Sequence, residues 1–164
     1  MSKAVMISIQ PHWCEMIANG EKTIEIRKTR PKLETPFKCY IYCTKPRFEH
    51  EDFFALVGKQ GFYGGGKVIG EFVCDKVYEL APLNHAPDDA EQQACMSREE
   101  IVQYLKGRGW GWHISNLKIY DKPVDITNFR NCNGCEYMGD CDTYCWKPMQ
   151  RPPQSWCYVE ALET

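Results

Sequence analysis

GEKTIEIR, residues 20–27, alternates apolar and charged side chains in the manner of a β-strand. A period of two places Ile24 and Ile26 on one face, which we expect to meet the core. Glu25 and Arg27 then share the opposite face. This stretch therefore predicts a strand that displays charged side chains.

The residues before this stretch predict a strand followed by a short helix. Residues 5–10, VMISIQ, alternate and place Ser8 and Gln10 on the face opposite three apolar side chains. Pro11 suits the first turn of a helix, and Asn19–Gly20 supplies a left-handed stop. Lys22 follows this stop, where the chain leaves the turn.

Further strands and one further helix follow. A capping box opens a helix at Ser97, where a serine precedes a glutamate by three residues. Many short strands with two or three short helices predict an α+β fold, a mixed β-barrel flanked by short helices. The additional strands are predicted at residues 39–43, 68–78, 110–120 and 156–162.

Glu71 stands out within the longest predicted strand. A period of two would place it on one face with Ile69, Val73 and Val77. A carboxylate among apolar neighbours is costly unless it is paired or protonated. Glu71 is therefore a candidate functional residue.

Length and composition are those of an ordinary globular protein. The chain has 164 residues, 43% hydrophobic and 26% charged, which predicts one domain over residues 1–164. Residues 46–67 are interpreted as an insertion, and residues 128–150 as a Cys-rich segment.

The net charge of −2 argues against attraction of a polyanion by the whole molecule, so nucleic-acid binding requires a local patch. No leader is recognisable, and no apolar run reaches the roughly 20 residues that cross a bilayer. We expect a cytoplasmic monomer without membrane contact. Basic residues cluster at Lys22, Arg27, Lys28, Arg30 and Lys32, although a solvated strand end would have the same composition.

Three segments together resemble the ASCH family, a branch of the PUA-like barrels. They are ISIQP at residues 7–11, GEKTIEIR at residues 20–27 and IGEF at residues 69–72. The closing run, residues 151–160, resembles versions found in phage and prophage genomes. The resemblance covers the chain except residues 46–67 and 128–150.

The resemblance implies a groove beside the first helix that binds RNA or a nucleotide. It would lie between the 20–27 strand and the strand of Glu71, with Lys22, Glu25, Arg27 and Glu71 as its charged groups. The alternative is an internal charge network that only holds the barrel closed. The predicted ligand-binding residues are Ser8, Gln10, His12, Trp13, Lys22, Glu25, Arg27, Glu71 and Trp156.

Some bacterial ASCH proteins are amidohydrolases that remove acetyl from N4-acetylcytidine, and their pattern is Gly-x-Lys-x-x-Thr-x-Arg with a later Glu. Lys22, Arg27 and Glu71 match it, whereas Glu25 replaces the threonine nucleophile. The alternative function is therefore hydrolysis of an acylated nucleoside, with Lys22, Glu25 and Glu71 as catalytic residues and a carboxylate activating water.

The Cys-rich segment predicts a metal site. Four thiols at Cys132, Cys135, Cys141 and Cys145 can surround one structural zinc ion tetrahedrally. An iron–sulfur cluster uses the same ligands, and a loop of reduced thiols is the remaining alternative. Four thiolates leave no open position for water, so this zinc would order the chain and would do no chemistry.

Overall fold

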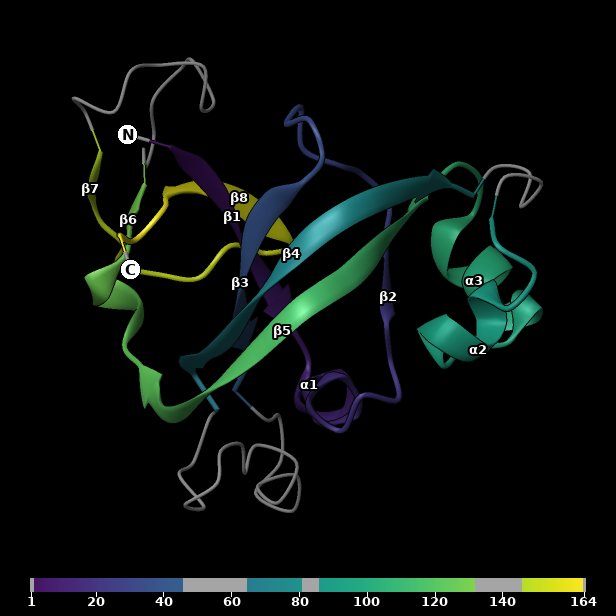
Figure 1. Cartoon of the computed structure of the whole chain (residues 1–164), viewed down its shortest axis with the longest axis horizontal. Coiled ribbons are helices and arrows are strands. Elements are labelled where there is room, and N and C mark those ends of the chain that lie inside the picture. Colours follow the sequence, from purple (N-terminus) through teal and green to yellow (C-terminus); the bar gives the residue numbers. More distant parts are fainter. Residues whose placement is uncertain (1, 46–64, 81–85, 132–145, 164) are drawn as a thin grey trace.

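Six strands form one mixed sheet that curves into a half-barrel (Figure 1). The computed structural model describes residues 2–45, 65–80, 86–131 and 146–163. The strand order is β2-β5-β4-β3-β1-β8, and a separate pair is formed by β6 and β7. The strands are β1 Lys3–Ile9, β2 Ile24–Arg27, β3 Phe37–Cys43, β4 Lys67–Glu79, β5 Trp110–Val124, β6 Arg130–Asn131, β7 Lys147–Pro148 and β8 Trp156–Glu160.

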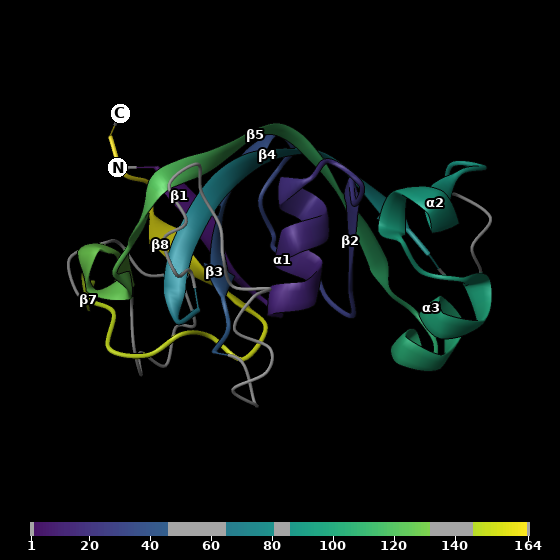
Figure 2. The ribbon, with the colours of Figure 1, turned by 90° about the horizontal axis from the view of Figure 1, so that it is seen from below.

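The sheet is antiparallel except between β1 and β3, which run parallel. Parallel neighbours need a long connection, and here it consists of α1 (Pro11–Ala18), β2 and the segment after it. Figure 2 shows α1 lying beneath the arch of β4 and β5. The predicted α+β fold, a mixed barrel-like sheet flanked by short helices, is confirmed.

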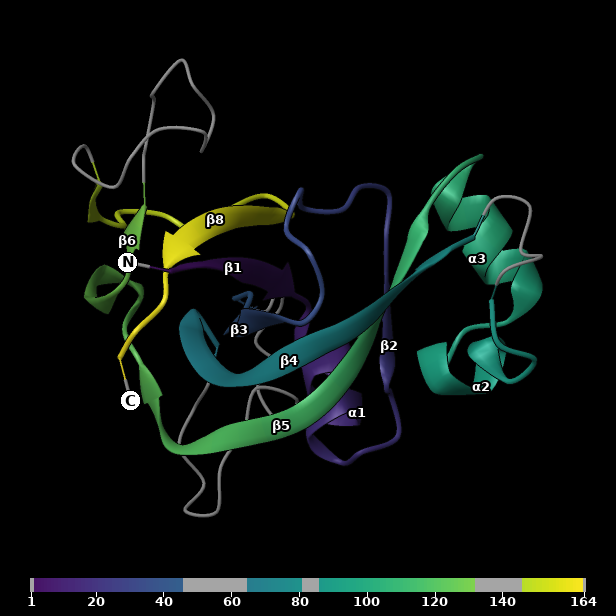
Figure 3. The ribbon, with the colours of Figure 1, turned by 45° about the horizontal axis from the view of Figure 1, so that its top comes forward.

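Two further helices, α2 (Ala90–Ala94) and α3 (Arg98–Leu105), lie beyond β2 at one end of the molecule (Figure 3). The predicted capping box is present at α3: the Ser97 hydroxyl accepts from the Glu100 backbone N–H, and the Glu100 carboxylate accepts from that of Ser97. The predicted stop after α1 is also present, with Gly20 at φ 79°. Each helix in the described part of the chain is too short or too polar to cross a bilayer.

Three clusters of buried side chains hold these elements together. The main core packs α1 against the concave side of the sheet, with Ile7, Ile17 and Trp112 among its members. A second cluster covers the other side of β1 and β3, where the 3-10 turn Ile126–Asn128 packs. The third joins β2 to α2 and α3 and consists of Ile24, Ile26, Leu80, Ala94, Ile101 and Leu105.

The third cluster corrects the expected orientation of β2. Ile24 and Ile26 do face a core, but it is the small one under α2 and α3. Glu25 lies directly opposite Trp112 of the main core in the β2–β5 ladder, so its side chain leaves on the main-core face. All four residues of β2 are therefore buried.

The face predicted for Glu71 is wrong, because β4 contains bulges. Ile41 pairs with Gly70 and Tyr42 with Val68, so Ile69 is an extra residue that reverses the alternation. Glu71 consequently pairs with Tyr40, a member of the second cluster. The residues of β4 that enter the main core are Ile69, Phe72 and Cys74, and Val77 packs against them.

Candidate ligand-binding cavity

A cavity of about 840 Å³ opens beside the start of α1. The N-terminus of α1, strand β2, the end of β3 and helix α3 all contribute walls. Its volume falls within the range of about 300–1,000 Å³ that is usual for small-molecule sites. The lining residues are Ser8, Gln10, Pro11, His12, Trp13, Lys22, Glu25, Ile26, Arg27, Thr44, Lys45, Met96, Tyr104 and Gln154.

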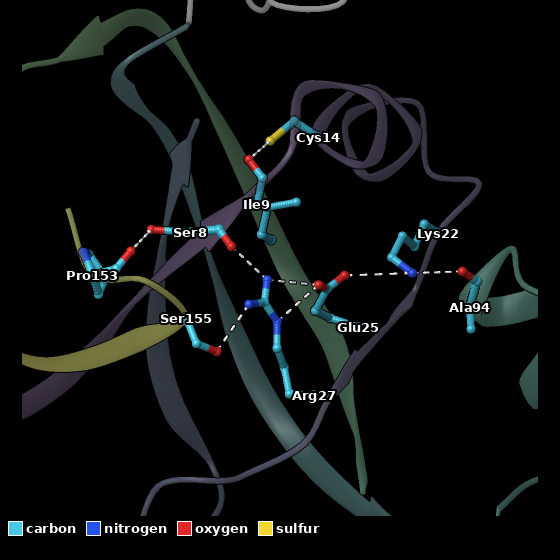
Figure 4. Close-up of polar contacts among 9 residues, drawn as sticks. All are labelled: Ser8, Ile9, Cys14, Lys22, Glu25, Arg27, Ala94, Pro153 and Ser155. Atoms are coloured by element: carbon cyan, nitrogen blue, oxygen red, sulfur yellow. Dashed lines mark hydrogen bonds and ion pairs between the residues drawn. The ribbon is translucent and has the colours of Figure 1, made fainter. Parts of the chain in front are cut away.

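Arg27 is the most extensively bonded side chain in this cavity (Figure 4). Its Nη2 donates to the Ser8 carbonyl oxygen at 2.6 Å, and its Nη1 donates to the Ser155 hydroxyl at 3.2 Å. Its Nε and Nη2 lie 3.1 and 2.9 Å from Glu25 Oε1. The guanidinium therefore joins β1, β2 and the residue before β8, while its charge stays inside the cavity.

Lys22 reaches the same carboxylate from the other side. Its Nζ lies 3.5 Å from Glu25 Oε2, donates to the Ala94 carbonyl oxygen at 2.6 Å, and sits 4.6 Å from the centroid of the Trp13 ring. The Trp13 ring adds a cation–π contact, which strengthens when the cation is desolvated. Lys22 thus lies inside the cavity.

The three charged side chains are almost fully buried: Lys22, Glu25 and Arg27 are 2%, 6% and 8% exposed. Burying an ion costs several kcal/mol unless partners replace its water. Arg27 and Lys22 have such partners, whereas Glu25 Oε2 accepts no hydrogen bond within the described residues. The Glu25 carboxylate therefore lies between two cations and keeps one buried oxygen without a hydrogen bond.

Six further residues of the predicted ligand-binding set have described positions, and four of them line the cavity. Ser8, Gln10, His12 and Trp13 do so, together with Lys22, Glu25 and Arg27, which are called the charged triad below. The Ser8 hydroxyl is already engaged, because it donates to the Pro153 carbonyl oxygen at 2.6 Å. His12 packs its ring 4.9 Å from that of Trp13.

Glu71 is not brought to the cavity, which corrects the predicted convergence of four charged side chains. Strand β5 lies between β2 and β4, so the expected groove between those two strands does not exist. Glu71 instead accepts a 2.5 Å hydrogen bond from the Tyr120 hydroxyl and lies 3.2 Å from Lys38 Nζ. Burial, and then the hydrogen bond to Glu71, raises the pKa of Tyr120.

Trp156 also lies apart from the cavity lining. Its ring packs against those of Trp112 and Tyr158, at centroid distances of 6.0 and 5.4 Å. Its Nε1 donates to the Thr29 hydroxyl at 2.9 Å. Trp156 therefore closes the edge of the main core.

The four predicted zinc ligands, Cys132, Cys135, Cys141 and Cys145, lie outside the described residues, so the zinc site stays a prediction. The ends of the Cys-rich segment are described: β6 pairs with β7, and Arg130 Nη2 donates to the Trp146 carbonyl oxygen at 2.6 Å. Among the described residues, no group of three histidine, cysteine or acidic side chains is arranged to hold a metal. Metal analysis of protein purified without chelator tests the prediction.

Seven lining residues were not in the predicted ligand-binding set: Pro11 and Ile26, which adjoin predicted residues, and five from distant segments. Thr44 and Lys45 follow β3, Met96 and Tyr104 come from the α2–α3 region, and Gln154 precedes β8. The periodicity of the sequence could not predict that these five residues line the cavity, because only the tertiary structure brings their segments together. Lys28, from the basic cluster seen in the sequence, lies close to one of them, with its Nζ 5.3 Å from the Tyr104 ring centroid.

Comparison with known proteins supports the fold. No family model and no curated protein sequence matches the chain. The crystal structure of the ASCH protein from Zymomonas mobilis superimposes with a TM-score of 0.62 and 16% sequence identity, over 96% of this chain and 87% of that one. A tyrosine-to-phenylalanine variant of that protein gives the same score and identity over 97% and 91%. The chain therefore has the fold of an ASCH domain.

Proposed function

We propose that the cavity binds a nucleobase, presented by a nucleotide or a short single-stranded RNA. The observation that carries the proposal is Glu25, a cavity-lining residue whose buried Oε2 has no hydrogen-bond donor in the described structure. A carboxylate accepts from an exocyclic base amine, as it does from that of cytosine. A base amine would supply the hydrogen bond that this oxygen lacks.

The charges and rings around Glu25 favour the same ligand class. Lys22, Arg27 and Lys45 place three cations against one carboxylate in the lining, which favours an anionic ligand. Tyr104 is 41% exposed and also lines the cavity, so its ring is accessible for base stacking. Stacking on an aromatic side chain contributes roughly 1–3 kcal/mol per base. The resemblance to ASCH proteins implies the same ligands.

Titration with nucleotides and short RNA, followed by chemical-shift mapping, tests the proposal. We expect micromolar or weaker dissociation constants, with Lys22→Ala and Arg27→Ala weakening binding strongly. Those variants also lose structural contacts, so Gln10→Ala and Gln154→Ala are needed: both side chains are exposed and line the cavity. Lys122→Ala, an exposed residue outside the lining, is the control. Equal binding by the parent and all cavity variants would overturn the proposal.

The alternative is hydrolysis of an acylated nucleoside such as N4-acetylcytidine. Glu25 Oε2 favours it, because a carboxylate oxygen without a hydrogen-bond donor is placed to accept a proton from water. Glu71 lies apart from the cavity, so Lys22 and Glu25 would act without it. Acetate release that is abolished by Glu25→Gln and retained by Glu71→Gln would support this reaction; no release by the folded parent would exclude that substrate.

A further inference from the structure

A further set of cations and aromatic rings adjoins residues of the cavity. It consists of Lys28, Arg30 and Arg108 with the rings of Tyr104 and Trp110, and it is called the basic strip below. Arg30 Cζ and Arg108 Cζ lie 5.5 and 5.0 Å from the Trp110 ring centroid. Lys28 Nζ lies 5.3 Å from that of Tyr104.

Both rings of the basic strip adjoin the cavity. Tyr104 belongs to the strip and to the cavity, because it lines the cavity and carries Lys28 on its ring. Trp110 pairs directly with Arg27 in the β2–β5 ladder. Residues directly opposite each other in an antiparallel pair project to the same face. Tyr104 and Trp110 therefore connect the basic strip to the cavity.

The strip keeps uncompensated positive charge at the surface. Within the described residues neither Lys28 nor Arg30 takes part in an ion pair. Arg30 is held by hydrogen bonds to the carbonyl oxygens of Pro31 and Leu33, which fix the guanidinium without neutralising it. Arg108 pairs with Glu79 at 2.8 Å, but its side chain remains 64% exposed.

We propose, on the basis of the proposed function, that the basic strip binds the sugar–phosphate backbone of a single-stranded nucleic acid whose base occupies the cavity. Arginine binds phosphate through two parallel hydrogen bonds, and holding its side chain against Trp110 reduces the entropy lost on binding. Grooves for single strands combine such cations with aromatic rings. The physiological ligand is then a strand and not a free nucleoside.

The test compares an eight-nucleotide single strand with the mononucleotide that binds best, by fluorescence anisotropy and competition. We expect the parent to bind the strand at least tenfold more tightly. Arg30→Gln with Arg108→Gln should remove this advantage and leave mononucleotide affinity unchanged, because neither residue lines the cavity. Lys118→Gln with Lys122→Gln removes the same charge from exposed positions outside the strip and should change neither affinity.

Salt dependence provides a second readout. Each lost phosphate contact lowers the slope of log affinity against log salt by about 0.7 for single strands, so the double arginine variant should lose about 1.4.

An unchanged slope and strand affinity would overturn the basic strip. If the parent bound the strand no more tightly than the mononucleotide, the basic strip would be overturned and the base-binding cavity would stand. Strand binding that needs the arginines but tolerates all cavity variants would sustain the strip and overturn the base-binding cavity. DNA and RNA strands of one sequence, run in parallel, distinguish the two polymers.

Discussion

Lys22 Nζ donates a 2.6 Å hydrogen bond to the carbonyl oxygen of Ala94, the last residue of α2. The same ammonium lies 3.5 Å from Glu25 Oε2 in the cavity. The backbone N–H of Thr23 also donates to the Gln93 carbonyl oxygen, at 2.8 Å. A cavity side chain therefore attaches the α2–α3 region to β2.

Lys22→Met should loosen α2 and α3. Removing one partner from a buried ion pair costs about 3–5 kcal/mol, and here a helix end loses its donor as well. We expect faster amide hydrogen exchange in residues 90–105, while β1 and β3 keep their protection. Lys45→Met, an exposed cavity residue, is the matched control. Equal exchange in α2 of the variant and the parent would contradict the attachment.

Glu71→Gln should reduce stability and leave ligand affinity intact. Glu71 lies on the other face of the sheet from the cavity, bonded to Tyr120 and Lys38. Weakening this partly buried network should cost about 1–3 kcal/mol in chemical unfolding. Tyr120→Phe should have a smaller effect in the Glu71→Gln background than in the parent, because the two share one hydrogen bond. A loss of nucleotide binding by folded Glu71→Gln protein would show that Glu71 belongs to the site after all.

Gly70→Ala should disrupt the pairing of β4 with β5. A Cβ atom at Gly70 would lie 2.4 Å from the carbonyl oxygen of Lys118, and backbone cannot give way there without breaking the ladder. We expect a large fall in melting temperature. Gly111→Ala is the milder comparison, since its Cβ would meet the Ile24 side chain at 3.1 Å. Similar melting temperatures for the two variants would contradict the close approach at Gly70.

Stability should decline at alkaline pH partly through Cys74. Burial raises the pKa of this thiol from 9.0 to about 12. Below pH 9 the thiol is protonated in both the folded and the unfolded chain, so its full contribution to the free energy of unfolding is present. Between pH 9 and 12 only the unfolded chain loses the proton, and stability falls by up to about 1.4 kcal/mol per pH unit.

Urea unfolding of the parent and Cys74→Val between pH 8.5 and 10.5 measures this contribution. The free energy of unfolding of the variant should decline less steeply with pH, and the difference in slope should correspond to close to one proton. Cys14 and Cys39, also deeply buried, keep their share of the slope in both proteins. Parallel declines would show that the Cys74 thiol does not resist ionisation in the folded state.

Local pattern was enough to predict the six strands of the main sheet, the first helix and the capping box, but not the short strands β6 and β7. The alternation around Ile24 and Ile26, and the serine–glutamate spacing at Ser97, are signals that involve only neighbours in the chain. The charged triad was also within reach, because Lys22, Glu25 and Arg27 lie on one short segment. Their burial was not, since it depends on contacts with α1, α2 and the segment before β8.

By itself the sequence determined that short amphipathic strands must bury their apolar faces in a barrel-like sheet, and that one segment would bring two cations and a carboxylate close together. Only the tertiary structure decided that β5 separates Glu71 from that segment and that α2 and α3 complete the cavity. The physical reason is that a bulge adds one residue and reverses every later side chain, while strand order depends on long-range packing. Neither leaves a periodic signal in the chain.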